Sequence, residues 1–174
     1  MYLNVIIYLL QMRDDIYFFH QTPEELAKQL IQYVTLEPND IVFEPFRGEG
    51  AFYNNFPNFC TKLYAEIENE IDYRDVKEHY DWVITNPPFK IDNKNCFYKL
   101  LEYFTTNSTK GIALLCNDYC LGTLTPKRIL DLNNKGWFVQ NIVVTQVKKW
   151  RGRYYFIILT KEKCNFFQYI IGNF

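Results

Sequence analysis

Short apolar runs alternate along this chain with stretches of helical periodicity. The runs are rich in β-branched and large apolar residues and stop at polar or turn residues, which predicts buried strands. These predicted strands lie at Ile41–Phe43, Leu63–Ala65, Asp81–Thr85 and Gly111–Cys116. Two longer β-rich runs follow, Val139–Val147 and Tyr154–Thr160, and predict a hairpin near the C-terminus. Strands that alternate with helices predict an α/β fold, a mostly parallel sheet covered on both faces.

Three stretches have the periodicity of amphipathic helices, and a Thr-Pro pair opens two of them. The apolar face of the first consists of Leu26, Leu30 and Val34. Thr22 is a favourable N-cap, Pro23 suits the first helical position, and Glu25 completes a capping box. We therefore expect a capped helix that runs to about Val34. The other two predicted helices cover residues 96–104 and 125–134.

The composition is that of an ordinary globular domain. With 174 residues, of which 48% are hydrophobic and 18% aromatic, the chain can build a sizeable core as a single domain over residues 1–174. The formal net charge of −1 gives no global attraction to nucleic acid, so any such affinity must come from a local patch or a partner subunit. Five cysteines without a Cys-x-x-Cys pair, and two histidines, favour a reducing cytoplasm and no metal site.

The first twelve residues, Met1 to Met12, are rich in apolar side chains. The run is too short to span a bilayer, and it lacks both a basic start and a small-residue cleavage site. We therefore expect a packed strand or helix, or an oligomer contact, and no membrane association.

The third predicted strand ends at Asn86-Pro87-Pro88-Phe89, and this tetrapeptide carries the clearest chemistry. Two consecutive prolines fix the backbone and cannot donate to a sheet ladder, so they predict a stiff loop at the carboxyl end of a strand. Open α/β sheets bind their ligands at that edge. The amide oxygen of Asn86 and the carbonyl of Pro87 could both accept hydrogen bonds from an exocyclic amine, and Phe89 could stack on its base. The alternative is a proline turn with a core phenylalanine.

Two motifs together resemble one enzyme family. Asn86-Pro87-Pro88-Phe89 resembles the (Asn/Asp)-Pro-Pro-(Tyr/Phe/Trp) catalytic motif of S-adenosylmethionine-dependent amino methyltransferases, best known for methylating the N6 amine of adenine. Glu44-Pro45-Phe46-Arg47-Gly48-Glu49-Gly50, after a predicted strand, resembles the cofactor-binding motif of the same family, with Glu44 where many members carry Asp. The resemblance covers residues 18–174. It implies the Rossmann-like class I methyltransferase fold, with a mostly parallel seven-stranded sheet and an antiparallel terminal hairpin.

The resemblance also implies S-adenosylmethionine as the cofactor, bound without a metal. Thr22-Pro23 stands where the family contacts the methionine carboxylate, although plain helix capping is the alternative. Glu66, followed by Ile67, ends the second strand and could accept both ribose hydroxyls. Asp72-Tyr73 matches a dipeptide that holds the cofactor adenine, while Asp75-Val76 is a competing alignment and either could be a solvated loop. The stretch before the next strand is too short for a full helix. The implied cofactor residues are Thr22, Pro23, Glu44, Pro45, Phe46, Gly48, Gly50, Glu66, Ile67, Asp72, Tyr73 and Asn86.

A cationic turn joins the two terminal strands. It contains four cations and one tryptophan, namely Lys148, Lys149, Trp150, Arg151 and Arg153. Such a tip could grip a phosphate backbone and stack a base, and the alternative is a solvated hairpin with a packed tryptophan. Lys90 and Lys94 lie in a polar loop after the tetrapeptide, on the side expected for the substrate.

The function that this reasoning favours is N6-adenine methylation of DNA or RNA. The motif order matches a subgroup that includes small enzymes of phages, viruses and mobile elements, for which the compartment would be the host cytoplasm. No separate target-recognition domain is expected. Two alternatives remain: methylation of a glutamine side chain in a protein, and a catalytically silent partner subunit that lends a nucleic-acid surface. A partner subunit or a homo-oligomer also remains open.

Overall fold

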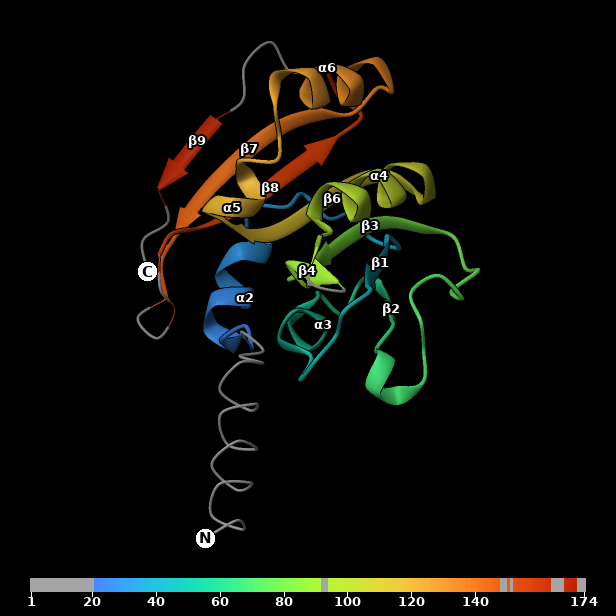
Figure 1. Cartoon of the computed structure of the whole chain (residues 1–174). Coiled ribbons are helices and arrows are strands. Elements are labelled where there is room, and N and C mark those ends of the chain that lie inside the picture. The colour runs from blue at the N-terminus through green and yellow to red at the C-terminus, as the bar shows by residue number, and fades with distance from the viewer. Residues whose placement is uncertain (1–20, 92–93, 148–149, 151, 164–167, 172–174) are drawn as a thin grey trace, which may run out of the picture.

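The computed structural model describes residues 21–91, 94–147, 150, 152–163 and 168–171 (Figure 1). The strands of its main sheet are β1 (Ile41–Glu44), β2 (Thr61–Tyr64), β3 (Tyr80–Thr85), β6 (Ser108–Asn117), β7 (Phe138–Thr145), β8 (Tyr154–Thr160) and β9 (Gln168–Ile171). They are ordered β2-β1-β3-β6-β8-β7-β9, so six strands lie between residues 41 and 160 and short β9 pairs with β7 at the edge. Only β8 runs antiparallel to its neighbours. The predicted α/β architecture, mostly parallel with an antiparallel hairpin, is confirmed.

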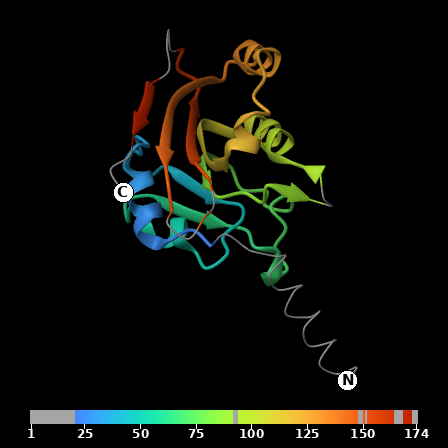
Figure 2. The same cartoon turned by 60° about the vertical axis from the view of Figure 1, so that its left-hand side comes forward.

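Helices cover both faces of this sheet. Helices α2 (Glu24–Ile31) and α3 (Ala51–Asn55) pack on one face, and α4 (Phe97–Asn107), α5 (Asp118–Leu121) and α6 (Pro126–Asn134) lie on the other (Figures 1 and 2). Central strand β6 supplies Ile112 and Leu114 to one core cluster, and Ala113 and Leu115 to the other. A strand buried on both faces requires a continuous apolar run, which explains its sequence.

The connection between β2 and β3 is short, as the sequence predicted. It contains only the three-residue 3₁₀ helix η1 (Ile67–Asn69) and an isolated bridge between Glu66 and Ile71. No full helix therefore crosses the sheet between these strands.

The two Thr-Pro pairs behave differently. Helix α2 starts at Glu24 with Pro23 as its N-cap, has no side-chain cap, and ends at Ile31. The predicted capping box and the extension to Val34 are therefore wrong. At α6, by contrast, the Thr125 hydroxyl accepts a hydrogen bond from the Arg128 backbone N–H at 3.4 Å, and this cap is confirmed.

A small hairpin stands where the sequence predicted a polar loop. Strands β4 (Lys90–Ile91) and β5 (Lys94–Asn95) pair antiparallel directly after the Pro-Pro tetrapeptide. The exposed side chains of Lys90 and Lys94 lie on this hairpin. The two ends of the predicted loop are thus paired with each other directly after the tetrapeptide.

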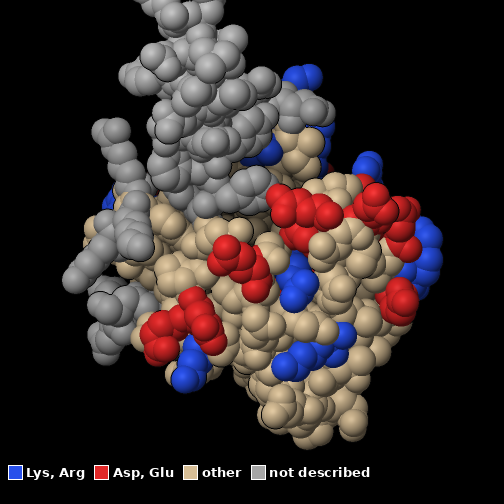
Figure 3. Space-filling view, turned by 90° about the horizontal axis from the view of Figure 1, so that it is seen from below, with Lys and Arg blue, Asp and Glu red and all other residues tan. Residues whose placement is uncertain are grey.

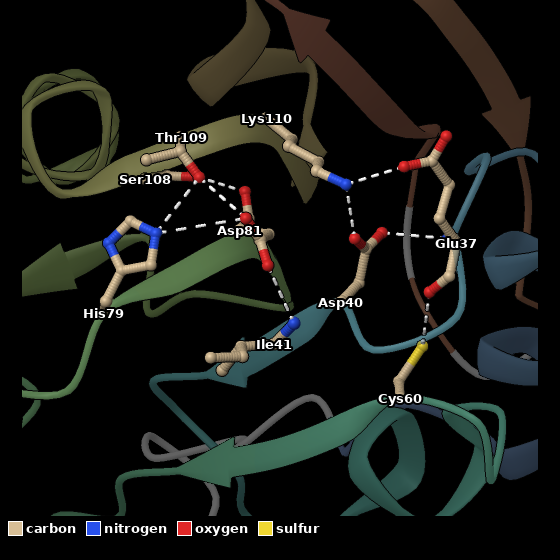
Figure 4. A network of polar contacts seen from close by, with 9 residues as sticks. All are labelled: Glu37, Asp40, Ile41, Cys60, His79, Asp81, Ser108, Thr109 and Lys110. Carbon is tan, nitrogen blue, oxygen red and sulfur yellow. Dashed lines mark hydrogen bonds and ion pairs between the residues drawn. The ribbon is translucent and has the colours of Figure 1, made fainter.

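A polar network joins the amino ends of three strands (Figure 4). One carboxylate oxygen of Asp81 accepts from the Ile41 backbone N–H at 3.0 Å, and the other accepts from the Thr109 hydroxyl at 2.9 Å. Burial disfavours the charge of Asp81, but these hydrogen bonds hold its pKa below the ordinary value. Beside it, Lys110 Nζ pairs at 2.6 Å with the buried carboxylate of Asp40. The network fixes β1, β3 and β6 relative to one another, at the edge opposite the Pro-Pro loop.

Some predictions fall outside the described residues, namely those for Met1 to Met12 and for Lys148, Lys149 and Arg151. Within the described ranges, no helix combines the length and apolar character that crossing a membrane requires. The same part of the chain holds no cluster of three His, Cys, Asp or Glu side chains suited to a metal ion.

Candidate functional site

The glycine turn lies between the end of β1 and the start of α3. Gly48 and Gly50 have φ values of +51° and +84°, in the left-handed region that favours glycine. The Gly48 backbone N–H donates a hydrogen bond to Glu66 Oε2, at the end of β2. The structure therefore brings the glycine motif and the predicted ribose-binding carboxylate into direct contact.

Gln21 lies over this turn. Its Oε1 atom accepts from the Glu49 backbone N–H at 3.4 Å, and a Cβ added at Gly48 would stand 3.0 Å from the same oxygen. Gly48 is thus close enough to a facing side chain that even one carbon would crowd it. Sequence reasoning did not identify Gln21, and its position directly before Thr22-Pro23 was the signal that could have found it.

Asn86 connects the Pro-Pro loop to the same segment. It follows the last residue of β3, and its Nδ2 atom donates to the hydroxyl oxygen of Thr22 at 3.2 Å. The Thr22 hydroxyl does not cap α2, and it binds the side-chain amide of Asn86 instead. The predicted cofactor segment and the predicted catalytic amide meet at the carboxyl edge of the sheet.

Contacts with Cys96 and Tyr154 hold the rest of the tetrapeptide. The carbonyl of Pro88 accepts a hydrogen bond from the Cys96 thiol at 3.0 Å, and Cys96 directly precedes α4. Pro87 is buried. The ring of Phe89 is half-buried and packs against Tyr154 of β8, with centroids 6.3 Å apart. These contacts hold the loop that carries Asn86.

Glu44 is buried and binds the backbone of helix α3. Its side chain is only 2% exposed, and its Oε2 atom accepts from the Tyr53 backbone N–H of α3 at 2.7 Å. Burial raises the pKa of Glu44 to about 8. Next to it, Pro45 is buried and the Arg47 guanidinium lies over the Tyr64 ring, 4.7 Å from its centroid. Glu44 thus anchors α3 behind the turn through one of its carboxyl oxygens.

The residues predicted for the cofactor adenine, Asp72 and Tyr73, lie in the short β2–β3 connection. The Phe46 and Tyr73 rings are in contact, with centroids 5.1 Å apart. Both carboxylate oxygens of Asp72 accept hydrogen bonds from the Arg74 guanidinium, which lowers the Asp72 pKa to about 2. Asp72 therefore faces Arg74, while Ile67, 68% exposed, faces solvent. The structure brings Phe46 and Tyr73 together, and Asp72 is linked to the Tyr73 ring through the Arg74 guanidinium, which lies 5.8 Å from the ring centroid.

The cationic turn is described only at Trp150, Gly152 and Arg153. Trp150 is 9% exposed and packs on Tyr154, with centroids 4.6 Å apart. The prediction that Trp150 offers a stacking face is therefore corrected, because the ring lies in the core as the packed alternative describes. The Arg153 side chain is 70% exposed and pairs with Asp118 at 3.2 Å.

Figure 3 shows the face seen from below Figure 1. On the described part of this face, Lys and Arg side chains alternate with Asp and Glu in small groups. Such mixing produces no extended field of one sign, which agrees with the net charge of −1.

Comparison with solved structures identifies the architecture. The chain superposes on a candidate RNA methyltransferase from Pyrococcus horikoshii with a TM-score of 0.61 and 17% identity, covering 80% of this chain and 86% of that one. The chain has a methyltransferase fold. The modification subunit of a candidate type I restriction enzyme from Vibrio vulnificus gives a TM-score of 0.61 at 13% identity, with 91% of this chain and 48% of that chain covered. This chain therefore spans about half the length of the Vibrio protein.

A third methyltransferase neighbour acts on a different kind of molecule by its name. It is precorrin-6y C5,15-methyltransferase from Geobacter metallireducens, with a TM-score of 0.55, 13% identity, and 81% and 89% of the two chains covered. No protein-family model matches the sequence, and neither does any curated protein. At these identities the methyltransferase fold is shared, and the substrate must be argued from the site.

Proposed function

We propose that this protein is an S-adenosylmethionine-dependent methyltransferase that acts on the exocyclic N6 amine of adenine in DNA or RNA. The observation that carries the proposal is the hydrogen bond between Asn86 and Thr22 at the carboxyl edge of the sheet. It joins the segment that resembles a cofactor site to the segment that resembles the amino-methylation motif. Neighbours of the same fold that are named as RNA or DNA-modification enzymes support the substrate class.

The residues around the glycine turn fit the cofactor. Positive φ at Gly48 and Gly50 lets the backbone approach a ligand closely, and the Glu66 carboxylate next to Gly48 can accept from ribose hydroxyls. Gln21 contacts the Glu49 N–H of the turn, Thr22 follows it and contacts Asn86, and this segment would face the methionine end. When bound, S-adenosylmethionine supplies an electrophilic methyl group on a positively charged sulfur.

The tetrapeptide acts on the amine of the substrate. With Nδ2 of Asn86 directed to Thr22, Oδ1 is the end of the amide that accepts from the amine, and the Pro87 carbonyl is a second acceptor. Accepting both protons localises the nitrogen lone pair, which stabilises positive charge that develops as the N–C bond forms and the S–C bond breaks. One amine proton then leaves to solvent. No covalent enzyme intermediate is needed, so the contribution is positioning and electrostatics.

The test combines calorimetry with radiolabelled methyl transfer. The protein should bind S-adenosylhomocysteine in calorimetry and, when given methyl-labelled S-adenosylmethionine, transfer the label to DNA or RNA at N6 of adenine. Asn86→Ala should abolish transfer while cofactor affinity and melting temperature stay near those of the parent. A matched control is Asn107→Ala, which removes an exposed amide from the end of α4. Undiminished transfer by the Asn86 variant would rule out the mechanism, and label found only in protein would replace nucleic acid with a protein amide as substrate.

A further inference from the structure

Three short segments surround the Pro-Pro loop on the β6 side. The β4–β5 hairpin contacts α5, because Asn95 Nδ2 lies 4.0 Å from the Cys120 thiol in a weak hydrogen bond. The turn before β8 contacts α5 as well, through the ion pair between Arg153 and Asp118. Phe89 in turn packs on Tyr154, the first residue of β8. The hairpin, α5 and residues 152–153 therefore form one continuous rim beside the predicted catalytic loop.

Helix α5 is firmly held within this rim. The Asn117 side chain caps it by accepting from the Cys120 backbone N–H at 2.9 Å. Asp118 accepts from the Tyr155 hydroxyl at 2.7 Å, in addition to its pairing with Arg153. Cys120, two positions after Asp118, is fully buried. Both neighbours of position 119 are thus fixed, one by hydrogen bonds and one by packing.

Tyr119 lies between these anchors and is 63% exposed. Among the large apolar side chains that the described residues leave exposed, only Tyr119 and Phe59 are aromatic. Phe59 precedes β2 and so lies at the amino edge of the sheet, away from the loop. Tyr119 follows β6, the strand next to β3, beyond the level at which Thr85 pairs with Leu114. It is therefore a rigidly supported aromatic face at the edge that carries Asn86.

The surroundings of Tyr119 suit a polyanion with exposed bases. Lys90 and Lys94 are exposed on the hairpin, and the Arg153 side chain, though paired, is 70% exposed. Proteins that bind single strands usually combine an aromatic ring that stacks on a base with nearby cations that contact the phosphates. In a duplex the base faces are covered by their neighbours, so a ring on the rim can be used only when the strand is locally unpaired.

We propose that Tyr119 stacks on an unpaired base adjacent to the target adenine, and that the substrate is single-stranded or locally unpaired nucleic acid. The inference rests on the proposed function and gives it a substrate class. It also assigns to Tyr119 the stacking role that the sequence had suggested for the buried Trp150.

The test measures binding of a fluorescent adenine-containing 12-mer, as single-stranded DNA, single-stranded RNA and duplex DNA. Tyr119→Ala should weaken single-strand binding about 5- to 150-fold, the effect of removing one stacking ring. Tyr119→Phe and Tyr119→Trp should retain it, because both keep an aromatic face. Phe59→Ala is the matched control and should bind as the parent does. Binding of S-adenosylhomocysteine should be the same in all variants, which checks that each is folded.

The outcomes separate the two claims. If the parent methylates nucleic acid and Tyr119→Ala binds single strands as tightly as the parent, the stacking role is overturned while the proposed function stands. Equal losses in Tyr119→Ala and Phe59→Ala, or tighter binding of the parent to duplex than to single strands, overturn it as well. If the parent binds the cofactor but binds and methylates no nucleic acid, the proposed substrate fails, and the stacking role fails with it.

Discussion

The amide nitrogen of Asn86 and the hydroxyl oxygen of Thr22 lie 3.2 Å apart although the two residues are 64 positions apart in the chain. The hydrogen bond between them holds the amide in one orientation, with its nitrogen toward the N-terminal segment. An amide that must accept from a substrate amine gains from such a fixed partner, since small misplacements of catalytic groups are costly. Thr22 is therefore a positioning residue for Asn86 in the mechanism proposed above.

Thr22→Ala should lower the rate of methyl transfer about 10- to 100-fold and leave the melting temperature nearly unchanged, because no helix cap is lost. Thr22→Ser, which keeps the hydroxyl, should restore most of the rate. The chain supplies its own control in Thr125→Ala. That change removes a real cap and should cost about 1 kcal/mol of stability, with transfer by the folded protein unaffected. Full activity of Thr22→Ala would show that the hydrogen bond does not position Asn86.

Glu66→Ala should weaken binding of S-adenosylhomocysteine by about 1–3 kcal/mol in calorimetry. The variant removes the acceptor proposed for the ribose hydroxyls, and it also leaves the Gly48 N–H without the carboxylate that now accepts from it. Glu68→Ala, which changes an exposed carboxylate two residues later, should bind as the parent does. Equal affinity of the Glu66 variant and the parent would remove Glu66 from the cofactor site.

The raised pKa of Glu44 predicts that the stability of the folded protein depends on pH. Burial raises its pKa in the folded protein to about 8, from an ordinary value of 4.5. The folded state therefore holds this proton more tightly than the unfolded state does. The resulting contribution to stability is complete below about pH 4.5 and is lost as the pH rises toward 8, at about 1.4 kcal/mol per pKa unit.

Glu44→Gln keeps an oxygen that can accept from the Tyr53 N–H and cannot ionise. The free energy of unfolding, measured with urea from pH 5 to 8, should therefore fall by a few kcal/mol more in the parent than in this variant. Glu24→Gln, at an exposed carboxyl group of α2, should follow the parent. Parallel curves for the parent and Glu44→Gln would mean that Glu44 does not titrate in this range.

Lys90 and Lys94 should bind some of the phosphates of the substrate. Replacing both by serine should weaken single-strand binding and reduce the slope of log Kd against log salt by roughly 0.7–0.9 for each phosphate that the protein no longer neutralises. Lys161→Ser with Lys163→Ser is the control, because these exposed residues follow β8 at the opposite edge of the sheet. An unchanged slope in the hairpin variant would exclude β4 and β5 from the docking surface.

The arrangement of the sheet could be predicted from the sequence because its causes are local. A short, continuous apolar run such as that of β6, bounded by polar residues, is typical of a strand buried on both faces, and such strands alternating with helices indicate the α/β architecture. Two consecutive prolines cannot extend a strand, so β3 had to end where Asn86 begins. The glycine turn followed from the same reasoning, since the positive φ of Gly48 and Gly50 is adopted most readily by a residue without a Cβ.

The partners of individual side chains were decided only by the tertiary structure. Thr22 and Thr125 both precede proline at the start of a helix, yet one hydroxyl holds Asn86 and the other caps α6. Trp150 is buried, although the charges around it in the sequence suggested an exposed stacking face, and Tyr119, for which the sequence carried no signal, is exposed. Local sequence determines which backbone conformations have a low free energy. The contacts between side chains depend on segments that are distant in the chain and become neighbours only when the sheet is assembled.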